Sequence, residues 1–168
     1  TTEIYTLSLH DALPISDDHE DEIRHEMTHP DIDALLNTVL PFAQQMLKKH
    51  GEFFPFGATM DKRGEIVLAA GAVEQERPLA QDIIDLLVAR FREQATKGTI
   101  KGCGVCYISR VVPPNDTRKV EAICASLEHE SGEAVSVFLP YHKGLFGHIS
   151  YGQLFAGGLD HQVFNTAD

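Results

Sequence analysis

The sequence predicts an α+β domain built from an antiparallel five-stranded sheet and two helices, in the order α-β-β-α-β-β-β. Three observations support this prediction. Two segments carry apolar residues at helical spacing, five segments are rich in β-branched or aromatic residues, and short polar turns separate most consecutive strands. Strands joined by short turns pair antiparallel, and both amphipathic helices are expected to cover one face of the sheet.

The first helix is expected to begin near Asp31 and to end at Gly51. Pro30 suits the first helical position, and acids in the first turn and lysines in the last complement the helix dipole. Pro41 interrupts this segment and is expected to kink the helix near Asn37 or to split it there. The apolar stripe is Ile32, Leu35, Leu36, Val39, Leu40, Ala43, Met46 and Leu47.

Two strands, residues 53–60 and 65–70, are expected to form a hairpin around a tight four-residue turn. Pro55 makes the start of the first strand an edge or a bulge. A polar loop follows, and then a second helix is expected to begin at Pro78 and to end at Gly98. Its buried stripe is expected to be Leu79, Ile83, Leu86, Leu87, Phe91 and Ala95.

Three longer strands are predicted at residues 99–112, 120–129 and 133–141. Alternation places Ile123, Ala125 and Leu127 on one face of the fourth strand, and Val135, Val137, Leu139 and Tyr141 on one face of the fifth. The segment from His142 onward is rich in glycine, so no strand is predicted there, and residues 150–156 are expected to form at most one helical turn.

Residues 1–16, TTEIYTLSLHDALPIS, resemble a translated sequencing-library adapter in one reading frame and without a gap. Residues 1–26 are therefore interpreted as an artefactual or disordered N-terminal extension. The acidic part, residues 17–26, is either a genuine tail or upstream non-coding DNA read in frame. Residues 27–158 are interpreted as a single α+β domain, and residues 159–168 as a loose C-terminal tail.

The net charge of the chain is -11, but residues 1–26 hold eight acids and one base. The remaining residues hold 17 acids and 13 bases, an ordinary balance for a small domain. They contain no cluster of Lys and Arg, so no nucleic-acid partner is expected. No apolar run approaches the roughly 20 residues of a membrane span, so no membrane partner is expected. Three cysteines are too few for a disulfide framework and favour a cytoplasmic location.

The element order over roughly residues 30–141 resembles that of the roadblock and profilin-like folds. Those folds usually add a substantial C-terminal helix, which is short or absent here. The resemblance rests on the order of elements and on no sequence motif. It therefore implies a fold and carries no functional residues to this chain.

Cys103 and Cys106 form a CxxC pair, which is typical of a redox site or of half a metal site. Their segment has the pattern of a strand, however, and residues three apart on a strand point to opposite faces. We therefore interpret the cysteines as structural. A thiol- or metal-dependent enzyme that uses this pair, with Cys124 or His129 as a further participant, is the alternative. A cluster of His142 and His148 with residues 128–130 is a further possibility.

Five apolar or aromatic residues are candidates for an interface: Phe53, Phe54, Tyr141, Leu145 and Phe146. Adjacent Phe53 and Phe54 cannot both face inward on a strand, and the turn KGLFG displays Leu145 and Phe146. The sequence contains no nucleophile elbow and no other catalytic constellation, and no cofactor is expected. It favours a non-catalytic bacterial-type interaction or regulatory module, either similar to immunity proteins or a dimeric regulator. The expected partner is another protein or a second copy, held through a sheet edge or the first helix.

Overall fold

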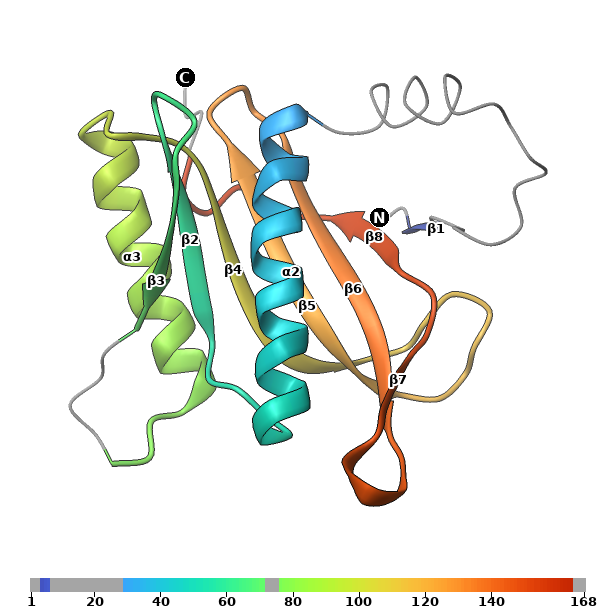
Figure 1. The fold of residues 1–168 in the computed structure, drawn as a ribbon. Coiled ribbons are helices and arrows are strands. Elements are labelled where there is room, and N and C mark those ends of the chain that lie inside the picture. The colour runs from blue at the N-terminus through green and yellow to red at the C-terminus, as the bar shows by residue number, and fades with distance from the viewer. Residues whose placement is uncertain (1–3, 7–28, 72–75, 165–168) are drawn as a thin grey trace.

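The computed structural model describes residues 4–6, 29–71 and 76–164. Figure 1 shows one antiparallel sheet and two long helices. The elements are β1 (Ile4–Thr6), α2 (Pro30–His50), β2 (Phe56–Asp61), β3 (Ile66–Ala70), α3 (Ala80–Thr96), β4 (Ile100–Val111), β5 (Val120–His129), β6 (Ala134–Lys143), the 3₁₀ turn η1 (Leu145–Gly147), β7 (Ile149–Tyr151) and β8 (Phe155–Gly158). The predicted N-terminal extension, apart from β1, lies outside the described residues.

The strands follow the order β1-β8-β6-β5-β4-β2-β3, and β7 pairs with the far end of β6. The predicted five-stranded sheet and its element order are therefore wrong, because the described residues form eight strands. The unpredicted strands are short, and two of them follow β6 in the glycine-rich segment. Strands of three or four residues are too short to show alternation, and the long edge of β6 stabilises them by pairing.

The helix α2 runs unbroken from Pro30 to His50, so the alternative of a split helix at Pro41 is wrong. Pro41 removes the hydrogen bond to the carbonyl of Asn37, and both residues lie on the exposed side of the helix, where that carbonyl is open to solvent. The predicted stripe is buried at Ile32, Leu35, Val39, Ala43 and Leu47. Gly51 ends the helix with φ 74° and donates its N–H to Leu47 at 2.8 Å.

The two helices pack on opposite faces of the sheet, so the expectation that both cover one face is wrong. Figure 1 shows α2 in front of the strands and α3 behind β3. On the α2 face lie Phe56, Cys106 and Ile123, and on the α3 face lie Cys103 and Val105. Because β4 is apolar on both faces, each face needs a helix to cover it. The predicted shared faces of β5 and β6 are confirmed, since both sets pack against α2.

A β-bulge in β4 changes where its first residues point. Met60 pairs with Gly102 while Asp61 pairs with Ile100, so Lys101 is the extra residue. The bulge allows Ile100 and Cys103, three positions apart, to enter the same core against α3. It also brings the ammonium group of Lys101 to the start of α2.

The chain after β8 returns to the α3 face. Val163 and Phe164 are buried there with Ile83, Leu87 and Phe91. The buried carboxylate of Glu128 accepts backbone N–H groups of Gln162 at 2.8 Å and Val163 at 3.1 Å. Residues 159–168 were expected to form a loose tail; the part up to Phe164 is packed in this way, and residues 165–168 lie outside the described residues.

Candidate functional site

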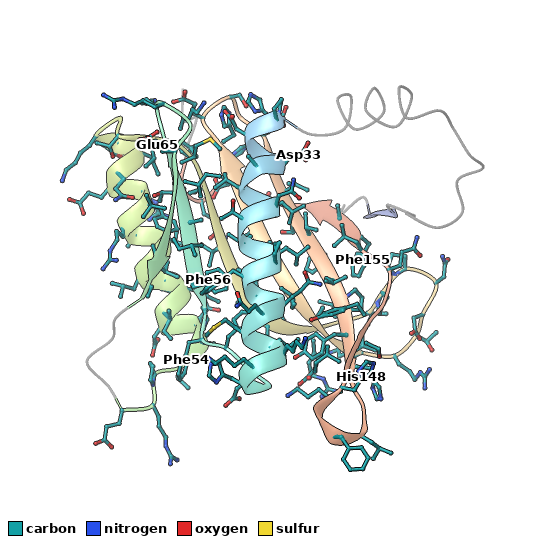
Figure 2. The ribbon with its side chains drawn as sticks, in the orientation of Figure 1. Asp33, Phe54, Phe56, Glu65, His148 and Phe155 are labelled. Atoms are coloured by element: carbon teal, nitrogen blue, oxygen red, sulfur yellow. The ribbon has the colours of Figure 1, made fainter. Side chains whose placement is uncertain are left out.

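The most exposed large apolar side chains lie at the tip of the hairpin formed by β6 and β7. Leu145 is 84% exposed and Phe146 is 105% exposed. Figure 2 shows His148 on this hairpin, which projects from the body of the molecule. Two adjacent, largely exposed apolar side chains form a small apolar patch, whereas exposed apolar residues scattered singly are common on protein surfaces.

The backbone of this tip is well paired although its side chains are not buried. Gly144 donates its N–H to the carbonyl of His148 at 2.7 Å, and β6 and β7 pair from Tyr141 to Lys143. Phe146 adopts φ 59°, a left-handed conformation that costs a bulky residue on the order of 1 kcal/mol. The turn therefore holds both apolar side chains outward at some cost in backbone energy.

The other interface candidates are distributed differently. Phe54 is 65% exposed, whereas Phe53 is half-buried with its ring 5.7 Å from that of Phe56. Tyr141 is buried in the core against α2. Burial raises the pKa of its phenol, and a hydrogen bond to the Glu121 carboxylate adds to the rise. Leu145, Phe146 and Phe54 therefore offer free apolar surface, and Tyr141 offers little.

A pocket of about 400 Å³ lies at the base of the same hairpin. The loop between β4 and β5 forms one wall and the hairpin strands form the other. Its apolar lining includes Pro113, Pro114, Pro140, Tyr151 and Phe155. The hairpin thus has a projecting tip next to a concave surface, a combination that suits contact with another protein.

The three cysteines do not form a site. Cys103 faces α3 and Cys106 faces α2, so the CxxC thiols lie on opposite faces of β4. All three cysteines are free and buried. Burial raises the pKa of all three thiols, and it raises that of Cys124 to about 12. The nearby Glu128 carboxylate adds to the rise for Cys103. Thiols with such pKa values are poor nucleophiles at neutral pH.

His129 belongs to a polar cluster at the start of α2. Its Nε2 lies 2.9 Å from Oδ2 of Asp31, and Nζ of Lys101 lies 3.1 Å from the same oxygen. The ring of His29 stacks on that of His129 with centroids 4.0 Å apart. Burial tends to raise the pKa of the Asp31 carboxyl, but the hydrogen bonds from Lys101 and His129 outweigh it and hold that pKa below its usual range.

His29, Asp31 and His129 lie close enough to hold a metal ion, but their hydrogen bonds argue against one. Nδ1 of His129 accepts the N–H of Ser131 at 3.0 Å, so its proton sits on Nε2 and points to Asp31. Nδ1 of His29 accepts the N–H of Asp31 at 3.1 Å. The ring nitrogens nearest Asp31 thus lack a free lone pair, and Lys101 already neutralises the carboxylate. The cluster fits a helix cap better than a metal centre.

The structure does not bring together the histidines of the cluster that the sequence suggested, which combined His142 and His148 with residues 128–130. His142 and His148 lie on the hairpin, whereas His129 lies near the start of α2. Figure 2 shows Asp33 of α2 and His148 at opposite ends of the molecule. No sequence pattern indicated the cluster of Asp31, Lys101 and His129, because Lys101 reaches Asp31 through the bulge.

The fold and these surfaces define a small α+β protein with one antiparallel sheet between two helices. Comparisons with protein-family models, with curated proteins and with solved structures each gave no match. No helix in the described part of the chain combines the length and the hydropathy that a membrane crossing needs. The resemblance of the element order to roadblock and profilin-like folds stays a prediction, and so does the resemblance of residues 1–16 to a translated sequencing adapter.

Proposed function

We propose that this chain is a non-catalytic module of a bacterial-type cytoplasm that binds another protein through the tip of its β6–β7 hairpin. The observation that carries the proposal is the high exposure of Leu145 and Phe146 on a well-paired turn. Leaving a Leu or Phe side chain in water forgoes about 1.5–3 kcal/mol relative to burying it. A partner with a matching apolar pocket recovers that energy, as in interfaces anchored by one or two large side chains.

Charge around the tip indicates what surrounds the partner's pocket. Lys143 precedes the two apolar residues, and the last turn of α2 adds Lys48 and Lys49. Nζ of Lys143 lies close to the glycine that ends α2, so the two basic segments meet. The proposed partner therefore presents an apolar pocket with carboxylates on its rim. Immunity-type and regulatory roles both fit such a contact.

Photo-crosslinking tests this proposal directly. Phe146 is replaced by p-benzoylphenylalanine, and Leu79 carries the same group as a control, because it is 69% exposed on a different element. We expect one discrete protein adduct from position 146 and none from position 79. The protein captured in this adduct is then purified and titrated with the wild type and with the Leu145→Asp variant. We expect the substitution to weaken binding at least tenfold.

Two results would contradict the proposal. One is the absence of an adduct from position 146, or the same adducts from both positions. The other is cosedimentation of the protein with phosphatidylserine vesicles that Leu145→Asp abolishes, which would assign the tip to a membrane surface.

The thiol-dependent alternative has one observation in its favour. Cys103 lines a pocket of about 260 Å³ between α3 and the C-terminal segment, beside Tyr107, Ser126 and Glu128. The raised pKa of Cys103 and the nearby carboxylate disfavour a thiolate there. We therefore keep the interaction module as the proposal.

A further inference from the structure

The strand β3 is an unprotected edge of the sheet. It pairs with β2 on one side, and in the described part of the chain no strand pairs with its other side. Figure 1 shows it at the margin of the sheet. Val67 is 63% exposed and Leu68 is 42% exposed. The strand reads IVLAA, without the charge, proline or bulge that usually blocks edge-to-edge pairing.

The hydrogen-bonding pattern shows which residues this edge offers. Asp61 donates its N–H to the carbonyl of Glu65 at 2.9 Å, so these two form a hydrogen-bonded pair. Bonded and non-bonded pairs alternate along an antiparallel ladder. The register pairs Met60 with Ile66 and Ala58 with Leu68, so Ile66, Leu68 and Ala70 point their N–H and C=O groups away from β2.

The edge is complementary to itself. When two copies of β3 run antiparallel with Leu68 opposite Leu68, Ile66 lies opposite Ala70 of the second copy. At each of these positions the outward-pointing N–H and C=O groups of the two copies then face each other, and each residue pair exchanges two hydrogen bonds. This register also pairs all five residues of the strand, whereas a shift by two residues leaves some of them unpaired.

The side chains match as well as the backbones. Ile66 packs on the core under α2, so Leu68 of each copy would meet on that face. Ala69 packs on the core under α3, and Val67 would lie opposite Ala69 of the second copy on that face. Cross-strand apolar pairs of this kind stabilise a sheet.

We propose that the chain forms a two-fold symmetric dimer by antiparallel pairing of β3 with β3 of a second copy, centred on Leu68. The dimer joins two sheets into one and buries the exposed edge. It uses a different surface from the hairpin tip, so the proposal stands independently of the proposed function. It would also present two tips, and two linked contacts can raise the apparent affinity for a multivalent partner.

Sedimentation equilibrium of the full chain tests the dimer. We expect the mass of two chains for the wild type and for the exposed-site control Leu79→Lys. We expect monomers for Leu68→Lys and for Leu68→Glu, because like charges then face each other at the two-fold axis. An equimolar mixture of these two variants should recover the dimer mass, and circular dichroism shows that each variant is folded.

Oxidation of Leu68→Cys gives an independent readout. Hydrogen-bonded partners have Cα atoms about 5.5 Å apart, within the range of a disulfide. We expect a disulfide-linked dimer from Leu68→Cys and none from Leu79→Cys. A wild type that stays monomeric at about 100 µM, roughly tenfold above a dissociation constant of about 10 µM, would overturn the proposal. So would a dimer that both charged Leu68 variants leave intact.

Discussion

Nε2 of His129, at the end of β5, lies 2.9 Å from Oδ2 of Asp31, in the first turn of α2. This contact joins residues 98 positions apart in the sequence and fixes the start of the helix on the sheet. The His129 side chain is 6% exposed and that of Asp31 is 21% exposed, so water screens the pair only partly. Lys101 completes the cluster from β4.

Replacing Asp31 should therefore destabilise the fold. Asp31→Asn removes the charge that Lys101 and His129 share, and a hydrogen bond to a charged group is worth about 1.5–3 kcal/mol. We expect a loss of about 2 kcal/mol in the free energy of unfolding by urea. The matched control Asp82→Asn, an exposed acid in the first turn of α3, should cost less than about 0.5 kcal/mol. Equal effects of the two substitutions would contradict the role given to the cluster.

The same carboxylate predicts a pH dependence. The pKa of Asp31 is lower in the folded protein than in the unfolded chain, so its contribution is complete above the unfolded value, about 3.9, and is lost as the pH falls through the folded value. Urea unfolding between about pH 5 and pH 2 should show a loss of stability below about pH 4. The loss should be smaller in Asp31→Asn. Parallel curves for the two proteins would count against this assignment.

The cysteines should be inert in the native state. Their burial and raised pKa predict no reaction with Ellman's reagent at neutral pH within minutes, and reaction of all three after unfolding in guanidinium. Phe146→Cys provides an exposed control that should add a single fast-reacting thiol. Rapid modification of Cys103 in the native protein would instead support the thiol-dependent alternative.

The hairpin tip should contribute little to stability. Phe146→Asn relieves the cost of a bulky residue at positive φ, since Asn tolerates this conformation, and we expect a change within about 0.5 kcal/mol. Phe155→Ala is the contrasting variant, because Phe155 is buried and stacks on Phe138 at 4.9 Å. It should cost about 3 kcal/mol. A large loss of stability in Phe146→Asn would mean that the tip serves the fold and not a partner.

Parts of this fold could be predicted from the sequence and others could not. The stripe of α2 and the faces of β5 and β6 are long periodic patterns, and the structure has them as expected. β7 and β8 lie in a glycine-rich segment and are too short to show alternation, and both form strands by pairing with β6. The placement of the helices on opposite faces follows from apolar residues on both sides of β4.

The same contrast holds for the candidate surfaces. Glycines on both sides of Leu145 and Phe146 indicated a turn that displays them, and both side chains are exposed. Tyr141 alternates with core residues of β6 and is buried with them. The contact between Lys101 and Asp31 depends on a bulge, which the pattern of β4 does not reveal.

The measurement that tests the central claim most directly is the yield of crosslinked adduct from p-benzoylphenylalanine at position 146 relative to position 79. Both positions are exposed and apolar, and only position 146 lies on the proposed contact surface. The proposed function predicts one discrete adduct at position 146 that Leu145→Asp abolishes, and none at position 79. Equal yields at the two positions, or an adduct that survives Leu145→Asp, would contradict it.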